Sequence, residues 1–302
     1  MTAKALSVVI PTFRRVDALQ RTLQRLFEGG TEGLEVLVHV DAGDADTAPM
    51  LATEFPQVRC LQAEVSQGPG GARNRLLREA RHEIVVSLDD DSYPMDPDFF
   101  ARVLVGFAAH PEAGVLAMTI VHDGEAAPKI HARAEEVADF VGCGCVYRQA
   151  AFLDTQGYVP LHPAYGMEEA DLALQLIDRG WKIVHRHDLR IRHATDRSHQ
   201  TATPVVAAHI RNTALLAFLR YPPRYTGFAI MQYLNRIVYS LRRGHLRGAV
   251  VGVIGTPVHL GRHRKLRAPL RAATIETARQ LRKAGQRASL PRKHAGPASA
   301  RT

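Results

Sequence analysis

The feature that most constrains this chain is an apolar run, Ile84–Leu88, that ends in three consecutive carboxylates at residues 89–91. A run of this length and composition predicts a buried β-strand. Three adjacent anions at a buried strand end repel one another and are poorly solvated. A divalent cation would relieve both costs, since carboxylate oxygens suit Mg²⁺ or Mn²⁺ bridging to substrate phosphates. Taken alone, the motif fits an acidic surface turn equally well, because residues 92–94 (Ser-Tyr-Pro) favour a turn.

Strand-like and helix-like patterns alternate along most of the chain. The expected strands lie at residues 6–11, 34–40, 58–61, 84–88, 114–121, 141–147, 181–186 and 189–193. The expected helices lie at residues 16–27, 47–55, 72–80, 96–109, 168–179, 204–219, 225–243 and 268–283, and residues 125–140 are irregular or helical. This alternation predicts an α/β fold with a mostly parallel sheet covered on both faces. In such a sheet ligands bind at the carboxyl ends of strands, which is where the acidic triplet stands.

Charge is unevenly distributed along the 302 residues. Between Leu241 and Thr302 there are 15 Lys and Arg residues and a single acid, Glu276, a surplus of +14. Because the whole chain carries +9, residues 1–240 carry −5. The basic tail indicates a polyanion or an anionic membrane surface as partner. The acidic main part argues against nucleic acid as its ligand.

Cysteine usage and hydropathy point to a reducing compartment. The three cysteines, Cys60, Cys143 and Cys145, form no disulfide framework, and the last two are expected to be small core residues. The N-terminus leads directly into a strand pattern without a signal peptide. No apolar run reaches the roughly 18 residues of a membrane span. We therefore expect a cytoplasmic protein, peripheral at the inner face of the plasma membrane if its tail binds lipid.

Five motifs follow one another in a fixed order: residues 7–14 (Ser-Val-Val-Ile-Pro-Thr-Phe-Arg), Asp41, residues 68–74 (Gly-Pro-Gly-Gly-Ala-Arg-Asn), the acidic triplet, and residues 168–172 (Glu-Glu-Ala-Asp-Leu). In this order and spacing they resemble the family 2 glycosyltransferases, inverting enzymes that use nucleotide-diphosphate sugars. The resemblance covers residues 7–222. It implies a GT-A, Rossmann-like fold followed by C-terminal helices and the basic tail. The glycine run lacks the Walker lysine and the Rossmann spacing, so neither an ATPase nor a dinucleotide-binding fingerprint fits.

The resemblance implies a role for each motif. In the nucleotide-sugar site, Asp41 would contact the uracil or ribose, although the family's second aspartate is missing here, and Arg73 would face a phosphate. Read without the family, Asp41 is a turn residue and the glycine run is a plain entry to a helix. The implied nucleotide-sugar site consists of Pro11, Thr12, Asp41, Arg73, Asp89 and Asp90.

The same resemblance implies a metal site and a general base. Asp91, helped by Asp89 and by His193 after the last strand, would hold Mn²⁺ or Mg²⁺. Glu169 stands where the family carries the aspartate that deprotonates the acceptor hydroxyl, and Glu168 is the alternative within the pair. Without the upstream motifs, two acids here would simply favour a helix N-terminus, and His193 is one of 15 histidines.

The resulting hypothesis is a metal-dependent hexosyltransferase that acts on a glycan or lipid-linked acceptor in cell-envelope or exopolysaccharide synthesis. The alternative is a catalytically inactive GT-A-like module that binds nucleotide sugar. We predict a catalytic domain at residues 1–222, a helical extension at 223–260 and a basic, partly disordered tail at 261–302. Apolar residues from Phe228 to Leu241 recur at helical spacing, either packed on the catalytic domain or forming an interfacial helix on a membrane.

Overall fold

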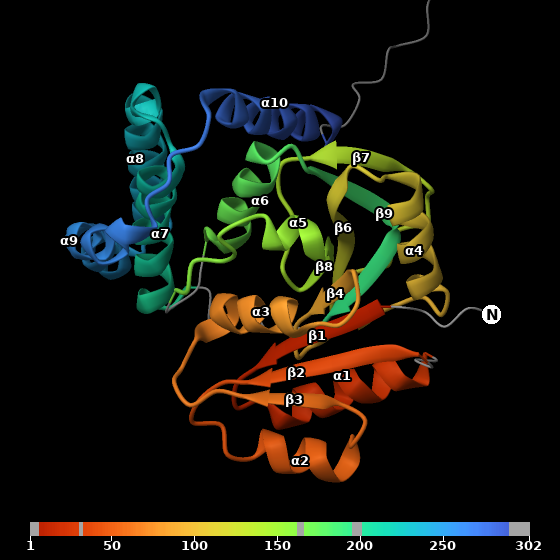
Figure 1. Ribbon diagram of the computed structural model, residues 1–302. Helices are drawn as coiled ribbons and strands as arrows, with labels where there is room; N and C mark the ends of the chain where they lie inside the picture. Colours follow the sequence, from red (N-terminus) through yellow and green to blue (C-terminus); the bar gives the residue numbers. More distant parts are fainter. Residues whose placement is uncertain (1–5, 30–32, 162–165, 195–200, 290–302) are drawn as a thin grey trace, which may run out of the picture.

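The computed structural model describes residues 6–29, 33–161, 166–194 and 201–289 (Figure 1). Nine strands form one sheet in the order β3-β2-β1-β4-β8-β6-β9-β5, and β7 pairs with β9 off this path. The strands are β1 (Leu6–Thr12), β2 (Leu34–Val40), β3 (Arg59–Gln62), β4 (Ile84–Leu88), β5 (Ser92–Pro94), β6 (Ala113–His122), β7 (Ala134–Val137), β8 (Gly144–Arg148) and β9 (Lys182–His193). The expected α/β fold is confirmed.

The helices alternate with these strands and then continue alone. They are α1 (Val16–Glu28), α2 (Thr47–Glu54), α3 (Gly68–Glu79), α4 (Phe99–Ala109), α5 (Gln149–Leu153), α6 (Glu168–Asp178), α7 (Thr203–Arg220), α8 (Thr226–Arg242), α9 (Leu246–His263) and α10 (Ala272–Ser289). None of the helices in the described part of the chain is long and apolar enough to cross a bilayer.

Parallel pairing dominates the first half of the sheet. β3, β2, β1 and β4 run parallel, with Leu6 of β1 opposite both Leu34 of β2 and Ile84 of β4. β8 then pairs antiparallel with β4 and β6, while β6 and β9 are parallel. The carboxyl ends of β1 and β4 therefore lie side by side, which brings residue 12 next to the acidic triplet.

Two apolar layers cover the two faces of the sheet, as expected from strands that are apolar on both sides. On one face α1, α2 and α4 contribute a cluster that includes Leu23, Leu51 and Val103. On the other face α3, α5 and α6 contribute Leu76, Phe152 and Leu172. Cys143 and Cys145 are buried, which confirms their assignment to the core.

Four local expectations differ from the structure. Helix α3 begins at Gly68, so the glycine run lies inside the first turn of the helix rather than before it. Strand β7 occurs in the segment expected to be irregular or helical. The two short strands expected near the end of the sheet are one strand, β9, with a register shift opposite Met118 and Thr119. The expected disorder of the last 15 residues falls largely outside the described ranges.

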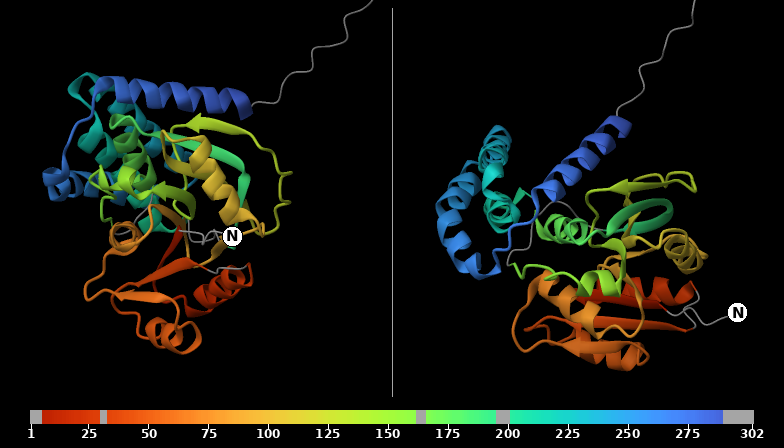
Figure 2. Two further views of the ribbon diagram at one scale, coloured as in Figure 1. Left: turned by 45° about the vertical axis from the view of Figure 1, so that its right-hand side comes forward. Right: turned by 45° about the horizontal axis from the view of Figure 1, so that its top comes forward.

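Helices α7, α8 and α9 form a separate layer beside the sheet, and α10 returns across the main body (Figures 1 and 2). The Arg282 guanidinium of α10 forms an ion pair with Asp139, 2.7 Å away. At the junction of α6 and α7, the fully buried Arg220 donates to both carboxylate oxygens of Asp171, at 2.6 and 3.0 Å. These contacts hold the C-terminal helices against the part of the chain that carries the acidic motifs.

Candidate functional site

The acidic triplet sits where β1 and β4 end together. Pro11 is within β1, and the Thr12 hydroxyl donates to Asp90 Oδ2 over 2.9 Å. The Thr22 hydroxyl of α1 donates to the Asp90 backbone carbonyl, also at 2.9 Å. Burial raises the pKa of Asp90 to about 7, against the opposing charge of Arg15. Asp90 therefore faces into the protein and anchors the triplet to β1 and α1.

Arg15 is a site residue that the sequence motifs did not single out. Its guanidinium lies 2.9 Å from Asp90 Oδ1 and 2.6 Å from Asp91 Oδ2, and its side chain is half exposed. The Arg15 guanidinium is paired with two of the three carboxylates at the strand end, Asp90 and Asp91. It thereby reduces the repulsion between the adjacent anions of the triplet. The available signal was the pair Arg14-Arg15, which follows the first strand after Phe13.

Asp89 is held from the opposite side by Arg73 of α3. The Arg73 guanidinium forms a buried ion pair with Asp89 and donates to the Ser87 hydroxyl at 3.3 Å. Arg73 itself is 4% exposed. Its charge is thus directed at the acidic triplet from within the core, and its expected role toward a phosphate stays a prediction.

Asp91 and His193 meet at the same strand end. His193 Nε2 lies 3.1 Å from Asp91 Oδ1 and 3.9 Å from Asp89 Oδ2. Burial opposes ionisation of Asp91, but His193 and Arg15 hold its pKa at about 2. Burial also disfavours the imidazolium of His193, yet Asp91 and Asp89 raise its pKa above the ordinary value.

This group of side chains fits a divalent cation. Asp91 Oδ1 is buried and forms no hydrogen bond of good geometry with any described residue. Asp89, Cys143 and His193 each offer a ligand atom, and these atoms lie within 4.8 Å of one another. Burial raises the pKa of the Cys143 thiol, which keeps the sulfur protonated and a poor ligand for a hard cation. Asp89, Asp91 and His193 are therefore the residues that could hold Mg²⁺ or Mn²⁺.

The two glutamates at the start of α6 lie in different environments. Glu168 is buried, and burial, followed by the charge of Glu169, raises its pKa to about 8. Glu168 Oε1 has no hydrogen-bond partner among the described residues. Glu169 is partly exposed, and its Oε1 accepts a hydrogen bond from the Gly142 N–H at 3.2 Å. Of the two glutamates, only Glu169 is open to solvent.

Two glycines leave room for these glutamates. A Cβ at Gly70 of α3 would lie 2.8 Å from Glu168 Oε1. A Cβ at Gly142 would lie 2.8 Å from Glu169 Oε1 and 3.1 Å from Arg73 Cζ. Gly142 is therefore a point of close approach between the glutamate pair on α6 and the Arg73–Asp89 ion pair on the sheet.

Asp41 follows β2 and faces the start of α3. Its carboxylate accepts hydrogen bonds from the backbone N–H groups of Ala42, Gln67 and Gly68 and from the Ser66 hydroxyl, at 2.8 to 3.1 Å. Burial opposes ionisation, but these donors lower the pKa of Asp41. With these four hydrogen bonds Asp41 fixes the loop before α3, and its expected contact with the uracil or ribose stays a prediction.

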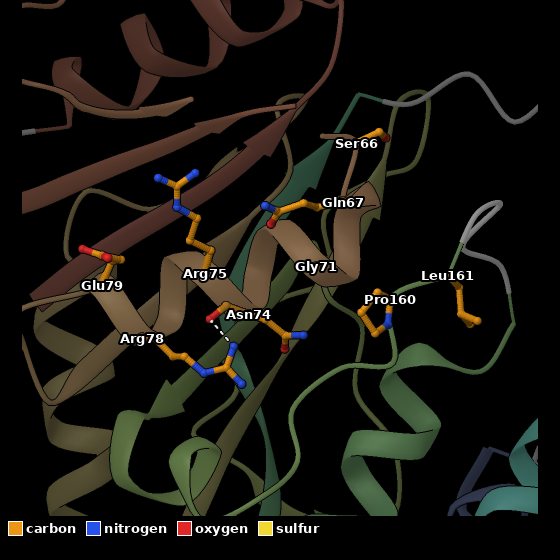
Figure 3. Close-up of a pocket in the computed structure, with 9 residues that line it drawn as sticks. All are labelled: Ser66, Gln67, Gly71, Asn74, Arg75, Arg78, Glu79, Pro160 and Leu161. Atoms are coloured by element: carbon orange, nitrogen blue, oxygen red, sulfur yellow. Dashed lines mark hydrogen bonds between the residues drawn. The ribbon is translucent and has the colours of Figure 1, made fainter. Parts of the chain in front are cut away.

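Cavities adjoin the site on two sides. A hollow of about 670 Å³ is lined by Arg14, Arg15, Arg21 and Gly43, and a second of about 410 Å³ shares Arg15 and Arg21 and reaches Asp91. A groove of about 560 Å³ runs along α3, with Asn74, Arg75 and Arg78 on one side and Pro160 and Leu161 on the other (Figure 3). The acidic triplet and the glutamate pair do not line this groove.

Comparison with known proteins gives consistent matches. Residues 7–154 match the model of the family described as Glycosyl transferase family 2. The chain is 32% identical over 90 residues to the GalNAc(5)-diNAcBac-PP-undecaprenol beta-1,3-glucosyltransferase of Campylobacter jejuni, covering 28% of this chain and 29% of that protein. It is 31% identical over 98 residues to the succinoglycan biosynthesis protein ExoO of Rhizobium meliloti, covering 32% and 28% respectively. The chain thus spans under a third of the curated relatives it matches.

The fold is shared with solved enzymes over most of the chain. The mannosyltransferase PcManGT of Pyrobaculum calidifontis, solved with GDP-Man and Mn²⁺, superposes with a TM-score of 0.57 at 16% identity, covering 92% of this chain and 84% of that one. At this identity the likeness concerns the fold, which confirms the GT-A architecture. Residues 7–154, which carry β1 to α5, therefore belong to family 2 of the glycosyltransferases.

Proposed function

We propose that this chain transfers a sugar from a nucleoside-diphosphate donor to an acceptor hydroxyl, with inversion at the anomeric carbon. The observation that carries the proposal is the close approach at Gly142. A Cβ at this residue would touch both the Glu169 carboxylate and the Arg73 guanidinium that pairs with Asp89. A base and a diphosphate site must lie on opposite sides of one sugar ring for inversion, which requires this kind of proximity. A module that only binds nucleotide sugar would have no need for a solvent-accessible carboxylate at this place.

The donor end of the reaction is assigned to the strand end. Asp89, Asp91 and His193 would hold the divalent cation, which when bound neutralises the charge that develops on the diphosphate leaving group. Arg15 supports this assignment, because its half-exposed guanidinium places a positive charge beside Asp91. The same side chain lines both arginine-containing hollows next to the site. Arg15 is free to turn toward the diphosphate once another cation neutralises the aspartates.

The remaining residues of the expected nucleotide-sugar site act through others. Thr12 orients Asp90, Pro11 precedes Thr12 within β1, and Asp41 fixes the loop before α3. Arg73 holds Asp89 in place. We assign these residues to positioning the donor site, and the identity of the nucleotide base is left to experiment.

The acceptor end is assigned to Glu169. A partly exposed carboxylate at this place can take the proton from an acceptor hydroxyl as the hydroxyl oxygen attacks the anomeric carbon. Glu168 is protonated below a pH of about 8 and so cannot accept this proton at neutral pH. The relatives act on an undecaprenol-diphosphate glycan and in succinoglycan biosynthesis. By analogy, we propose a glycan or lipid-linked acceptor of cell-envelope or exopolysaccharide synthesis.

Product stereochemistry tests this mechanism. A donor with an axial, α-linked diphosphate should give a β-linked product, and proton NMR of the anomeric signal distinguishes the two. Activity should disappear in chelator and return with Mn²⁺ or Mg²⁺. An α-linked product would contradict a single displacement of the diphosphate by the acceptor hydroxyl with Glu169 as its base, and full activity in chelator would contradict the metal site.

The second proposal concerns the outer surface of α8 and α9, which we propose docks on an anionic lipid bilayer. Helix α9 turns its small residues, Gly248 and Gly252, toward α7, where a Cβ would lie within 3 Å of Val206 and Ile210. Its large apolar residues therefore point outward. The exposed large apolar side chains of the two helices are Ile230, Met231, Leu234, Val238, Tyr239, Leu241, Leu246, Val250, Val251, Val253, Ile254 and Val258.

Charge selects lipid over a protein partner. Residues 226–275 contain nine Lys and Arg residues and no acid. Such a surface gains about 1 kcal/mol for each cation held near anionic lipid, and the gain is screened by salt. One cation is already used, because Arg271 pairs with Asp178 of α6. A contiguous apolar surface with a basic surround is typical of peripheral membrane binding.

Vesicle flotation of the full chain tests the docking surface. We expect salt-sensitive binding to vesicles of phosphatidylcholine and phosphatidylglycerol, lost in a double variant Met231→Asp, Ile254→Asp. Val105→Asp, an equally exposed apolar position on α4, is the matched control and should bind as wild type. Equal binding to neutral vesicles, unchanged binding of the double variant, or a stable dimer that the double variant dissociates would each overturn the proposal. Point variants are preferable to truncation, because α10 packs on the main body through Arg282.

A further inference from the structure

We infer that Glu135, His185 and His187 form a second metal site, for a divalent transition-metal ion such as Zn²⁺, separate from the acidic triplet. The three side chains come from neighbouring strands, and one ligand atom from each lies within 4.8 Å of the others. Two imidazoles with one carboxylate are a donor set that Zn²⁺ takes when it keeps a fourth position open. The inference does not depend on the proposed transferase activity.

Strand pairing brings the three residues together. Glu135 of β7 is directly opposite His185 of β9 in the antiparallel register. Side chains alternate along a strand, so His185 and His187 share one face, and their ring centroids are 4.2 Å apart. Glu135 Oε1 lies 3.0 Å from His187 Nε2 and 3.9 Å from His185 Nδ1. These two separations, from the Glu135 oxygen to each imidazole nitrogen, are close to those between two ligand atoms of one Zn²⁺. Only a small adjustment is therefore needed to bind the ion.

The outer atoms of two ligands are already held. His185 Nε2 lies 3.4 Å from the Thr119 hydroxyl of β6, which leaves Nδ1 as the atom facing Glu135. The Arg133 guanidinium donates to Glu135 Oε2 at 2.6 Å, which leaves Oε1 facing both imidazoles. Partners of this kind orient metal ligands and fix the histidine tautomer. A simple surface ion pair would not need the ring of His185 to be fixed from behind.

Protonation states agree with this geometry. Burial, followed by the neighbouring His187, lowers the pKa of His185, so this imidazole is neutral at pH 7 and able to bind metal. Burial opposes ionisation of Glu135, but His187 and Arg133 lower its pKa and keep it anionic. All three side chains are partly exposed, which leaves an entry path for the ion and a position for water.

The site lies away from the donor site along the same strand. His193 at the end of β9 pairs with Ser92 of β5, whereas His185 pairs with Glu135 of β7. A bound ion would join β7 to β9 by a second link besides the backbone ladder. Because β7 leads into Asp139, which anchors α10, the ion should stabilise the docking of the C-terminal helix.

Cobalt titration of the full, untagged chain tests the inference. After treatment with chelator and its removal, Co²⁺ added to wild type should produce the visible absorption of a nitrogen-ligated, four- or five-coordinate ion. Zn²⁺ should displace it. His187→Ala and Glu135→Gln should each lower the apparent affinity for Co²⁺ at least tenfold. His110→Ala removes a lone histidine beside Glu112 and is the matched control.

Two further arms distinguish the sites. Asp91→Ala should keep the Co²⁺ absorption, because it alters only the acidic triplet. Zn²⁺ should raise the melting temperature of wild type and of Asp91→Ala but not of His187→Ala, because an ion stabilises the folded chain only when it binds to it. Co²⁺ absorption that is unchanged in both His187→Ala and Glu135→Gln, or lost in Asp91→Ala, would overturn the inference. Circular dichroism of each variant establishes that it is folded.

Discussion

The Gly142 N–H donates a hydrogen bond of 3.2 Å to Glu169 Oε1 and thereby ties the proposed base to the sheet. The carbonyl of the same residue accepts a hydrogen bond from the Ser87 hydroxyl at 2.9 Å, and this hydroxyl in turn accepts one from the Arg73 guanidinium. A short path of hydrogen bonds therefore joins Glu169 to the residue that holds Asp89. The relative placement of base and donor site depends on the residue between them having no side chain.

Substitution at this position should separate catalysis from folding. Gly142→Ala would place a Cβ 2.8 Å from Glu169 Oε1 and 3.1 Å from Arg73 Cζ, so both must move. We expect kcat to fall at least tenfold, because small misplacements of a base cost rate steeply. Gly261→Ala in α9, where nothing lies within 4 Å of a new Cβ and φ is not positive, is the control for a glycine substitution. Unchanged kcat in Gly142→Ala would show that the hydrogen bond does not place Glu169.

Removal of the proposed metal ligand should abolish turnover without unfolding the chain. Asp91→Ala leaves Arg15 and His193 without their shared anion, so Mn²⁺ or Mg²⁺ should no longer support activity. Steady-state rates against metal concentration measure this loss. Asp98→Ala, an exposed aspartate at the start of α4, should retain wild-type rates. If Asp91→Ala keeps its metal-dependent activity, the ligand assignment is wrong.

Arg15 should contribute to donor binding. A charge-assisted hydrogen bond is worth about 1.5–3 kcal/mol, so Arg15→Gln should weaken nucleoside diphosphate binding roughly 10- to 100-fold in the presence of metal. Calorimetric titration of the nucleotide measures it. Arg25→Gln, in the last turn of α1 and paired with Glu28, serves as the comparison. Equal affinity in wild type and Arg15→Gln would confine Arg15 to neutralising the aspartates.

The buried Glu168 predicts a pH dependence of stability. Its pKa rises from 4.5 to about 8 on folding, so between these values the folded chain keeps a proton that the unfolded chain has released. Stability should therefore fall as pH rises through this window, by up to about 1.4 kcal/mol per pH unit from this group. Glu168→Gln removes the titration. The free energy of unfolding of wild type relative to Glu168→Gln should decline between pH 5 and pH 8, and a flat difference would contradict the raised pKa.

The sequence was sufficient for the α/β fold, because this fold leaves local patterns along the chain. Apolar runs end in polar motifs at the carboxyl edge of the sheet, so the ends of β1 and β4 could be placed together before the structure. The polar strand β7 was missed, since residues 134–137 (Ala-Glu-Glu-Val) carry little apolar alternation and depend on pairing with β9.

The burial and the pairing of the individual site residues could not be predicted from the sequence. Which glutamate is buried depends on the distant Gly70, and the target of Arg73 depends on the packing of α3 against β4. Likewise the outward orientation of α9 follows from the small residues that face α7. These are contacts between segments far apart in the chain, and a single sequence does not record them.

The central claim, that Glu169 catalyses glycosyl transfer from a nucleotide sugar, is tested most directly by nucleoside diphosphate release. Wild type and Glu169→Gln would be compared across UDP-, GDP- and dTDP-sugars with Mn²⁺, with an undecaprenol-diphosphate glycan as acceptor. We predict acceptor-dependent release by wild type with at least one donor, and a rate ~10²–10⁴-fold lower in Glu169→Gln at unchanged nucleotide affinity. Wild-type rates in Glu169→Gln would contradict the account, as would loss of activity in Glu168→Gln alone.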